Sequence, residues 1–477
     1  MLRADNDVRL LTFPESRRIP PAKGRAVIGF TRRRLYPEPM SYAPPSPSSL
    51  RSEEHKPVIP WALWDAGASS FHAVMTTFVF NVYLTSELFG SKNHTSQALS
   101  IGLAAAGLVI AVTAPVTGQR ADRGGSRRKA LAVTTAAVAV CVALCFFVRP
   151  DPAFLWVGVG LIAAANVFNE IATVHYNAVL PSISTPETVG RVSGLGWSFG
   201  YFGGIIALVI VLFGFVSPGL LGIPEDDSLN LRAVALFSAI WLAGLSLPIL
   251  LRFPGATAPE SGYGAATGRM VSAHKESWVD SYRRLGRTIR RLYRHEPVAL
   301  RFLIASAVFR DGLAGVFTYG GVLAAGTFGF STSQVIVFAI AGNVVAGLGA
   351  VVGGRLDDAL GPKRVIIGSL SGLLIAAAPL LLVQSPGLFW VCGLALCAFV
   401  GPAQSASRTY LSRLTKPGDE GEYFGLYSTT GRAMSFLAPA LFALFVGLLG
   451  DQVWGILGIM IVLALGLALA VRLPTRP

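Results

Sequence analysis

Two stretches decide the fold of this chain: GQRADRGGSRR at residues 118–128 and GRLDDALGPKR at residues 354–364. Both follow the pattern GxxxDxxGx and then two basic residues, and they stand 236 positions apart. A second motif recurs with identical spacing at an offset of 231, where Gly190, Gly194, Leu195 and Gly200 return as Gly421, Gly425, Leu426 and Gly431. Two independent motifs at nearly one offset indicate that the chain contains a duplicated unit.

Each copy of the unit carries six apolar runs of membrane-spanning length. A helix crosses the hydrocarbon core of about 30 Å in about twenty residues. The first six runs lie near residues 60–85, 97–118, 130–148, 153–179, 192–216 and 231–251, and the second six near 299–325, 332–354, 364–384, 387–411, 423–449 and 452–471. With 52% hydrophobic and only 14% charged residues, the sequence predicts an all-α membrane protein of twelve transmembrane helices in two pseudo-symmetric six-helix halves.

The distribution of basic residues predicts the orientation of these spans. If both termini are cytoplasmic, 33 of the 40 Lys and Arg lie in cytoplasmic segments, and the opposite loops hold only Lys92 and Arg149. Basic residues concentrate on the cytoplasmic side of membrane proteins. The net charge of +14 is therefore a topology signal and indicates no nucleic-acid partner. We expect a multi-pass protein of the cytoplasmic (inner) membrane with both termini in the cytoplasm.

The predicted division of the chain follows from these spans. The two halves occupy residues 58–252 and 299–472, joined by a cytoplasmic linker at 253–298 and followed by a short tail at 473–477. Residues 1–57 carry eleven basic residues and a Pro/Ser-rich stretch without apolar periodicity, so we expect them to be unfolded. They contain no short apolar run that is typical of a removable signal, and the sequence leaves open whether translation begins at Met1 or Met40.

The linker contains an amphipathic helical pattern at residues 278–294. Its apolar residues are Trp278, Tyr282, Leu285, Ile289 and Leu292, and arginines at 283, 284, 287, 290, 291 and 294 cover the other face. This pattern is typical of a helix on the anionic cytoplasmic leaflet, with anionic lipid as its partner. It is equally compatible with a helix packed under the bundle that uses its arginines for solubility.

Polar residues within the spans are the candidates for a transport site. A charged side chain at the centre of a membrane helix costs roughly 2.5 to 3.5 kcal/mol or more, so each one requires a partner or a water-filled cavity. Four spans, the first, fourth, seventh and tenth, are polar on one side. Their candidate residues are Asp65, His72, Asn166, Asn169, Glu170, Asn177, Arg310, Asp311, Gln404 and Arg408.

Each candidate also has a purely structural alternative. Asp65 would cap or pair near the cytoplasmic end of its helix, and Glu170 would form a buried ion pair with Arg310 or Arg408 that only fixes helix packing. His72 either shuttles protons or is a hydrogen-bonded packing group. For Glu170 and Asp311 we favour a functional role, because ionisable residues inside membranes are usually functional.

The duplicated loops are the candidates for gating. Glycines permit tight turns, basic residues hold a loop on the cytoplasmic side, and an aspartate can cap a helix N-terminus or pair with arginine. Topology anchoring alone explains the basic residues but not the repeated aspartate, so we favour a gating role. The set comprises Gly118, Asp122, Arg123, Gly125, Arg127 and Arg128 with Gly354, Asp358, Gly361, Lys363 and Arg364.

The duplicated loop motif resembles the signature of the major facilitator superfamily. More narrowly, four stretches resemble its Atg22-like branch: Trp61 to Phe71, Gly190 to Trp197 with Gly200-Tyr201, Arg310-Asp311-Gly312, and Glu422 to Tyr427. The resemblance implies that spans one, four, seven and ten surround a central cavity, and it implies amino-acid efflux as one activity. The loops depart from the superfamily pattern at Ser126 and Ala359, where a basic residue is usual, so we expect their gating contacts to be weaker than is usual in the superfamily.

The motifs that are absent narrow the function further. The sequence has no GxxxxGK[ST] phosphate loop, no HExxH and no GxSxG, so we expect no ATP hydrolysis, no enzymatic activity, no metal and no cofactor. A channel is disfavoured because no repeated filter or charged ring is present. We expect a monomeric secondary transporter of a small solute, driven by the solute gradient or by protons. A multidrug or other metabolite exporter is the alternative to amino-acid efflux.

Overall fold

The computed structural model describes residues 57–124, 127–216, 220–252 and 277–475, and within them every regular element is a helix. Ten of these helices are long and apolar enough to cross a membrane. The other two expected spans are also helical: the first changes to a π-helix at Phe71–Phe78, and the seventh is the continuous helix Pro297–Gly326, which carries Arg310 and Asp311. The all-α membrane fold is confirmed, and the total of twelve spans stays a prediction.

The helices of the first half follow the predicted order. They are α1 (Val58–Ser70), the π-helix η1 (Phe71–Phe78), α2 (Phe80–Leu84), α3 (Lys92–Arg123), α4 (Arg127–Leu144), α5 (Leu155–Ile183), α6 (Val189–Val211) and α7 (Leu229–Arg252). Helix α3 extends five residues past the predicted span end at 118, because the loop motif itself continues the helix up to Arg123.

The linker and the second half contain eight further helices. They are α8 (Trp278–His295), α9 (Pro297–Gly326), α10 (Thr332–Leu360), α11 (Pro362–Leu382), α12 (Pro386–Leu414), α13 (Glu420–Met434), α14 (Leu437–Leu449) and α15 (Gly455–Val471). The expected single span at 423–449 is therefore broken between α13 and α14. The carboxylate of Asp311 accepts a hydrogen bond from the backbone N–H of Ala438 at 2.6 Å and so caps the restarted helix.

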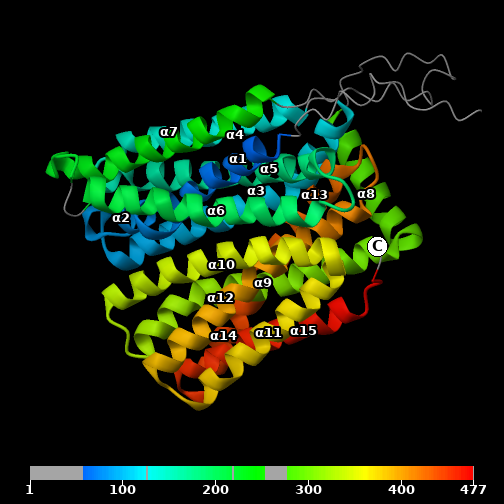
Figure 1. Ribbon diagram of the computed structural model, residues 1–477. Helices are drawn as coiled ribbons and strands as arrows, with labels where there is room; N and C mark the ends of the chain where they lie inside the picture. Colours follow the sequence, from blue (N-terminus) through cyan, green and yellow to red (C-terminus); the bar gives the residue numbers. More distant parts are fainter. Residues whose placement is uncertain (1–56, 125–126, 217–219, 253–276, 476–477) are drawn as a thin grey trace, which may run out of the picture. The chain divides into compact units, whose positions relative to one another are not determined.

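The hydrophobic core falls into two main clusters, roughly one for each half. One cluster is built only from residues between Trp61 and Ile249. The larger second cluster is centred on α9 to α15 and also includes Ile110, Ala114, Val174 and Ala178 of the first half. The halves meet along two helix pairs, α3 with α13 and α6 with α10, which run side by side in Figure 1. In each pair one helix carries the GxxxD motif and the other carries the second repeated glycine motif.

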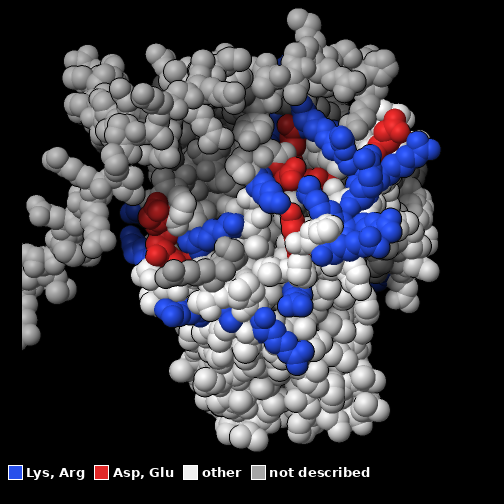
Figure 2. All heavy atoms as spheres, turned by 90° about the vertical axis from the view of Figure 1, so that its right-hand side faces the viewer, with Lys and Arg blue, Asp and Glu red and all other residues white. Residues whose placement is uncertain are grey.

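One end of the bundle carries most of the described basic residues, and we call it the basic end. Figure 2 looks onto this end, where Lys and Arg side chains gather with Asp and Glu side chains between them. The loops from α3 to α4, α5 to α6, α10 to α11 and α12 to α13 lie here. The predicted tail at 1–57 and the linker before residue 277 lie almost wholly outside the described residues.

Helix α8 packs on the basic end of the bundle. Ser281, Thr288 and Leu292 on one face are buried, and the Tyr282 hydroxyl donates to the carbonyl of Val112 in α3 at 3.3 Å. Of the expected apolar face, however, Ile289 is exposed. The packed arrangement is thus observed, and it leaves an apolar flank on the outer side of the helix.

Candidate functional site

Polar residues between the two halves form three layers at increasing depth from the basic end. The basic-end layer contains the duplicated loops. A gate layer centred on Arg408 lies roughly 10 Å deeper, given about 1.5 Å of rise per residue from the end of α12 at Leu414. A mid-span layer centred on Glu170 lies roughly 20 Å from the end of α5 at Ile183 by the same measure.

In the basic-end layer, Asp122 joins the first half to the second. Its Oδ2 accepts a hydrogen bond from the backbone N–H of Glu422 at 3.0 Å, in the first turn of α13. Its Oδ1 accepts one from Arg127 Nε at 2.8 Å, and Arg127 also pairs with Glu420. The carboxylate therefore both caps a helix N-terminus and pairs with an arginine, the two roles expected from the sequence.

Asp358 makes the reciprocal contact from the second half. Its Oδ1 accepts from the backbone N–H of Gly190 at 2.7 Å and its Oδ2 from that of Arg191 at 3.1 Å, both in the first turn of α6. Each repeated aspartate thus caps a helix of the opposite half. The two motifs that revealed the duplication contact each other twice, once on each side of the pseudo-symmetry axis.

Repeated glycines allow these helices to cross closely. A Cβ added to Gly118 would collide with the backbone of Gly421, and one added to Gly190 would stand 2.5 Å from the carbonyl oxygen of Gly354. Backbone therefore meets backbone at both crossings, which only glycine permits. The basic end is closed by four helix ends in direct contact.

The remaining loop residues divide into separate roles. Lys363 Nζ donates to the carbonyls of Val471 at 2.8 Å and Leu473 at 2.5 Å and so caps the C-terminus of α15. Gly361 has a φ of 87°, which favours glycine at the turn into α11. Arg128 and Arg364 are exposed. Arg123 lines a pocket with arginines of α8. Gly125 lies outside the described residues.

In the gate layer, Arg408 of α12 binds the first half. Its Nε donates to Ser193 Oγ at 2.9 Å and its Nη2 to the Ser193 carbonyl at 2.6 Å. Its Nη1 donates to Asn177 Oδ1 at 3.2 Å and stands 3.9 Å from Asp65 Oδ2. The side chain is buried, so its charge depends on these partners.

Aromatic rings enclose the same guanidinium group. It lies 4.9 Å from the ring centre of Trp61, 5.7 Å from that of Tyr176 and 5.6 Å from that of Trp197. The hydroxyl of Tyr176 also donates to Asp65 Oδ2 at 3.3 Å. Such cation–π contacts stabilise a desolvated arginine, so in the gate layer three aromatic rings of the first half surround one arginine of the second.

In the mid-span layer, Glu170 of α5 binds α13 of the other half. Its Oε2 accepts from Arg432 Nη2 at 2.8 Å and its Oε1 from the Ser428 hydroxyl at 2.6 Å. Beside it, His72 Nε2 and Asn169 Nδ2 are 3.0 Å apart, and the His72 side chain is exposed. The layer thus combines an inter-half ion pair with an accessible imidazole.

Arg310 of α9 adds a second cation to the mid-span layer. Its Nη1 donates to the carbonyl of Tyr427 at 3.2 Å, and its guanidinium lies 3.8 Å from the ring centre of the same tyrosine. Both contacts are within the second half, and no carboxylate pairs with Arg310 among the described residues.

The structure corrects one alternative and adds one residue. The ion-pair partner of Glu170 is Arg432, not Arg310 or Arg408. The sequence reasoning misses Arg432 because it treats only four spans as polar, although an arginine within an apolar span is the same signal that identifies Arg310. The structure does not bring Asp311 to this layer, since it caps α14 instead. Asn166 and Gln404 are half-buried on α5 and α12.

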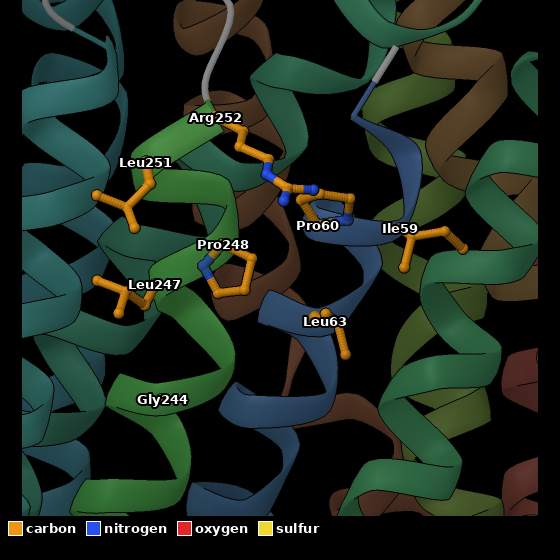
Figure 3. A pocket seen from close by; sticks show the side chains of 8 residues that line it. All are labelled: Ile59, Pro60, Leu63, Gly244, Leu247, Pro248, Leu251 and Arg252. Atoms are coloured by element: carbon orange, nitrogen blue, oxygen red, sulfur yellow. The ribbon is translucent and has the colours of Figure 1, made fainter. Parts of the chain in front are cut away.

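A groove between α1 and α7 lies apart from these layers. It has a volume of about 430 Å³ and is lined mainly by apolar side chains and by Arg252 (Figure 3). Ile59, Leu247 and Leu251 in its wall are among the exposed large apolar residues of the bundle. None of the predicted site residues lines this groove, so it does not belong to the candidate transport site.

Comparison with known sequences places most of the chain in one family. The family model described as "Vacuole effluxer Atg22 like" matches residues 85–476. The uncharacterized MFS-type transporter YxiO of Bacillus subtilis is 23% identical over 421 residues, which cover 87% of this chain and 94% of that protein. Autophagy-related protein 22 of Cryptococcus neoformans is 26% identical over 294 residues, 58% of this chain and 51% of that protein. This chain therefore spans about half the length of that fungal relative.

Comparison with solved structures identifies the fold. The proton:xylose symporter XylE matches with a TM-score of 0.67 at 14% identity, over 87% of this chain and 94% of XylE. The transporter FucP, in its outward conformation, matches with a TM-score of 0.61 at 14% identity, over 87% and 98% of the two chains. At such identities the likeness concerns the fold alone. With the family match over most of its length, the chain belongs to the Atg22-like transporters of the major facilitator superfamily.

Proposed function

We propose that this protein is a secondary active transporter that binds a small solute at the mid-span layer and moves it by alternating access. The Glu170–Arg432 ion pair is the observation that carries the proposal, because it joins the two halves near mid-membrane. When the halves move apart, Glu170 and Arg432 lose each other as partners, and each buried charge then needs a new partner. A charged solute between the halves supplies those partners.

The charges of this layer favour an amino acid as the solute, with efflux as the direction. Arg310 and Arg432 provide two guanidinium groups for a carboxylate, while Glu170 accepts an ammonium group. A zwitterion therefore matches the layer better than an uncharged sugar or an apolar drug. We further propose that Glu170 carries protons when Arg432 releases it, with His72 beside it as a second titratable group.

We propose that the basic end faces the cytoplasm in the cytoplasmic membrane. The concentration of arginine at this end supports the orientation. In this arrangement the structure is closed toward the cytoplasm, and both the basic-end layer and the gate layer must open before solute enters from that side.

The test is counterflow in proteoliposomes with a panel of amino acids, with and without a pH gradient. Glu170→Gln should lower the transport rate by about tenfold or more, as expected for loss of a charge-assisted hydrogen bond, and should remove any dependence on the pH gradient. Glutamine keeps the shape of the side chain but cannot titrate.

Asp311→Asn is the matched control, because it makes the same change of carboxylate to amide outside the mid-span layer. The amide oxygen can still accept from Ala438, so transport should persist. Equal transport by wild type and Glu170→Gln at every pH would refute the site, and transport of no amino acid by the wild type would refute the proposed substrate class.

A further inference from the structure

A polar pocket lies at the basic end, between α8, α3 and α13. It has a volume of about 310 Å³ and adjoins the basic-end layer, because Glu422 in its wall donates its backbone N–H to Asp122. Four arginines and a threonine line it together with two carboxylates: Arg123, Arg284, Arg287, Arg291, Thr288, Asp419 and Glu422. Positive charge therefore exceeds negative charge in its wall.

Helix periodicity explains how α8 contributes four of these residues. Arg284, Arg287, Thr288 and Arg291 stand at positions i, i+3, i+4 and i+7, which share one face of a helix. The same face packs on the bundle, since Thr288 is buried. Arg283, Arg290 and Arg294 lie on the outer face and are exposed.

Two of the arginines in the wall, Arg287 and Arg291, keep hydrogen-bond donors that no described residue uses. Asp419 pairs with Arg291 at 3.2 Å, yet Arg291 Nε is buried without a hydrogen-bond partner among the described residues. Glu422 accepts from Gln119 at 2.6 Å. Arg287 is exposed and makes no ion pair or hydrogen bond with any described residue. A buried donor without a partner costs free energy, so the Arg291 Nε and the exposed guanidinium of Arg287 both give the pocket unused donor capacity.

We propose that this pocket binds a phosphate-bearing anion, either a soluble phosphate compound or the headgroup of a phospholipid. Guanidinium groups donate paired hydrogen bonds that match the oxygens of phosphate. The excess of positive charge excludes a cationic ligand. The pocket also gives a defined location to the anionic-lipid contact expected for this helix.

The site couples anion binding to conformation. Arg123 belongs to the first half, Asp419 and Glu422 belong to the second, and the remaining residues belong to the linker helix. The complete pocket exists only while the basic end is closed. A ligand that binds one of two conformations shifts the equilibrium toward it, so the anion stabilises the closed basic end. This inference is independent of the identity of the transported solute.

The experiment measures binding to the purified full chain at constant ionic strength. In one arm, inorganic pyrophosphate is titrated onto protein in detergent. In the other arm, the protein is placed in nanodiscs of phosphatidylcholine alone or mixed with phosphatidylglycerol. In both arms the readouts are thermal stability and the alkylation rate of a cysteine at Ser405, which is fully buried between the halves. Bound anion should raise the thermal stability and lower the alkylation rate.

The variants Arg287→Gln and Arg290→Gln separate the pocket from general surface charge. Both remove one arginine from α8, but only Arg287 lines the pocket. Arg287→Gln should weaken the response about tenfold, the usual effect of losing one charged hydrogen-bond donor, while Arg290→Gln should match the wild type. A response to pyrophosphate identifies a soluble source, and a response to phosphatidylglycerol alone identifies a lipid. Equal responses from the two variants, or none from the wild type in either arm, would overturn the proposal.

Discussion

At the scale of single residues, the contacts of the repeated aspartates explain why the duplicated loops contain a carboxylate. A tight turn needs glycine, but only an anion complements the unpaired N–H groups and the partial positive charge of a helix N-terminus. Asp122 and Asp358 each supply that anion to the opposite half. The contact therefore stabilises one conformation of the transporter rather than one half of it, which topology anchoring alone does not explain.

The prediction at this scale concerns Asp122→Asn. The amide keeps an acceptor for the Glu422 N–H but loses the charge that pairs with Arg127, so the closed basic end should lose about 1 to 2 kcal/mol. Alkylation of a cysteine at Ser405 should become faster and the transport rate should fall, with normal insertion into the membrane. Asp358→Asn should act in the same direction. Unchanged alkylation and transport in both variants would mean that the aspartates only anchor the topology of their loops and do not act in gating.

The sequence reveals which residues carry a charge inside a span, but it does not reveal which residues of other helices they contact. Glu170 and Arg408 are identified from sequence, because a charge in an apolar span is visible without a structure. Their partners are not, since Arg432 and Ser193 come from helices more than 200 residues away in the chain. Asp311 meets the same criterion as Glu170, yet it caps α14. The break in that span comes just before Pro439, but proline alone does not identify it, because Pro115 and Pro402 lie inside continuous helices of the same chain.

At the scale of elements, close helix crossings hold the basic end together. Gly118 in α3 faces the backbone of Gly421 in α13, whereas a Cβ added to Gly107, three turns earlier in α3, would meet no atom within 4 Å among the described residues. The sequence predicts only that each motif glycine of the first half has a counterpart at the equivalent position of the second half. Only the structure shows that the pairs contact each other across the interface between the halves.

The prediction for this element compares Gly118→Ala with Gly107→Ala. The added methyl group at position 118 cannot be accommodated without moving α3 away from α13, so the closed basic end should open and transport should fall severalfold. Gly107→Ala makes the same chemical change in the same helix, where alanine favours helix by about 1 kcal/mol, and should transport normally. For both variants, a transport assay measures the transport rate, and alkylation of a cysteine at Ser405 measures the opening of the basic end. Normal transport and alkylation in Gly118→Ala would mean that this crossing is not required for closure.

At the scale of the whole molecule, each half has its own main core cluster, and the halves are joined by polar contacts, glycine crossings and a few buried apolar residues of α3 and α5. Apolar cores resist separation because of their buried area, but hydrogen bonds and ion pairs at an interface can be exchanged for water at modest net cost. The duplication and the apolar runs predict two such halves from sequence. Which conformation they adopt depends on the balance of inter-half contacts, which no pattern within one half determines.

Ser193 and Ser405 provide the most direct test of motion between the halves. Their hydroxyl oxygens are 3.2 Å apart, on α6 of the first half and α12 of the second, and cysteines at such positions are close enough to form a disulfide. Oxidation of the double variant Ser193→Cys/Ser405→Cys should therefore lock the basic end closed and abolish transport, and a reductant should restore it. The single variants should show no dependence on oxidant. If the cross-linked protein continues to transport, the solute crosses without separation of these helices, and alternating access of the two halves must be replaced by another mechanism.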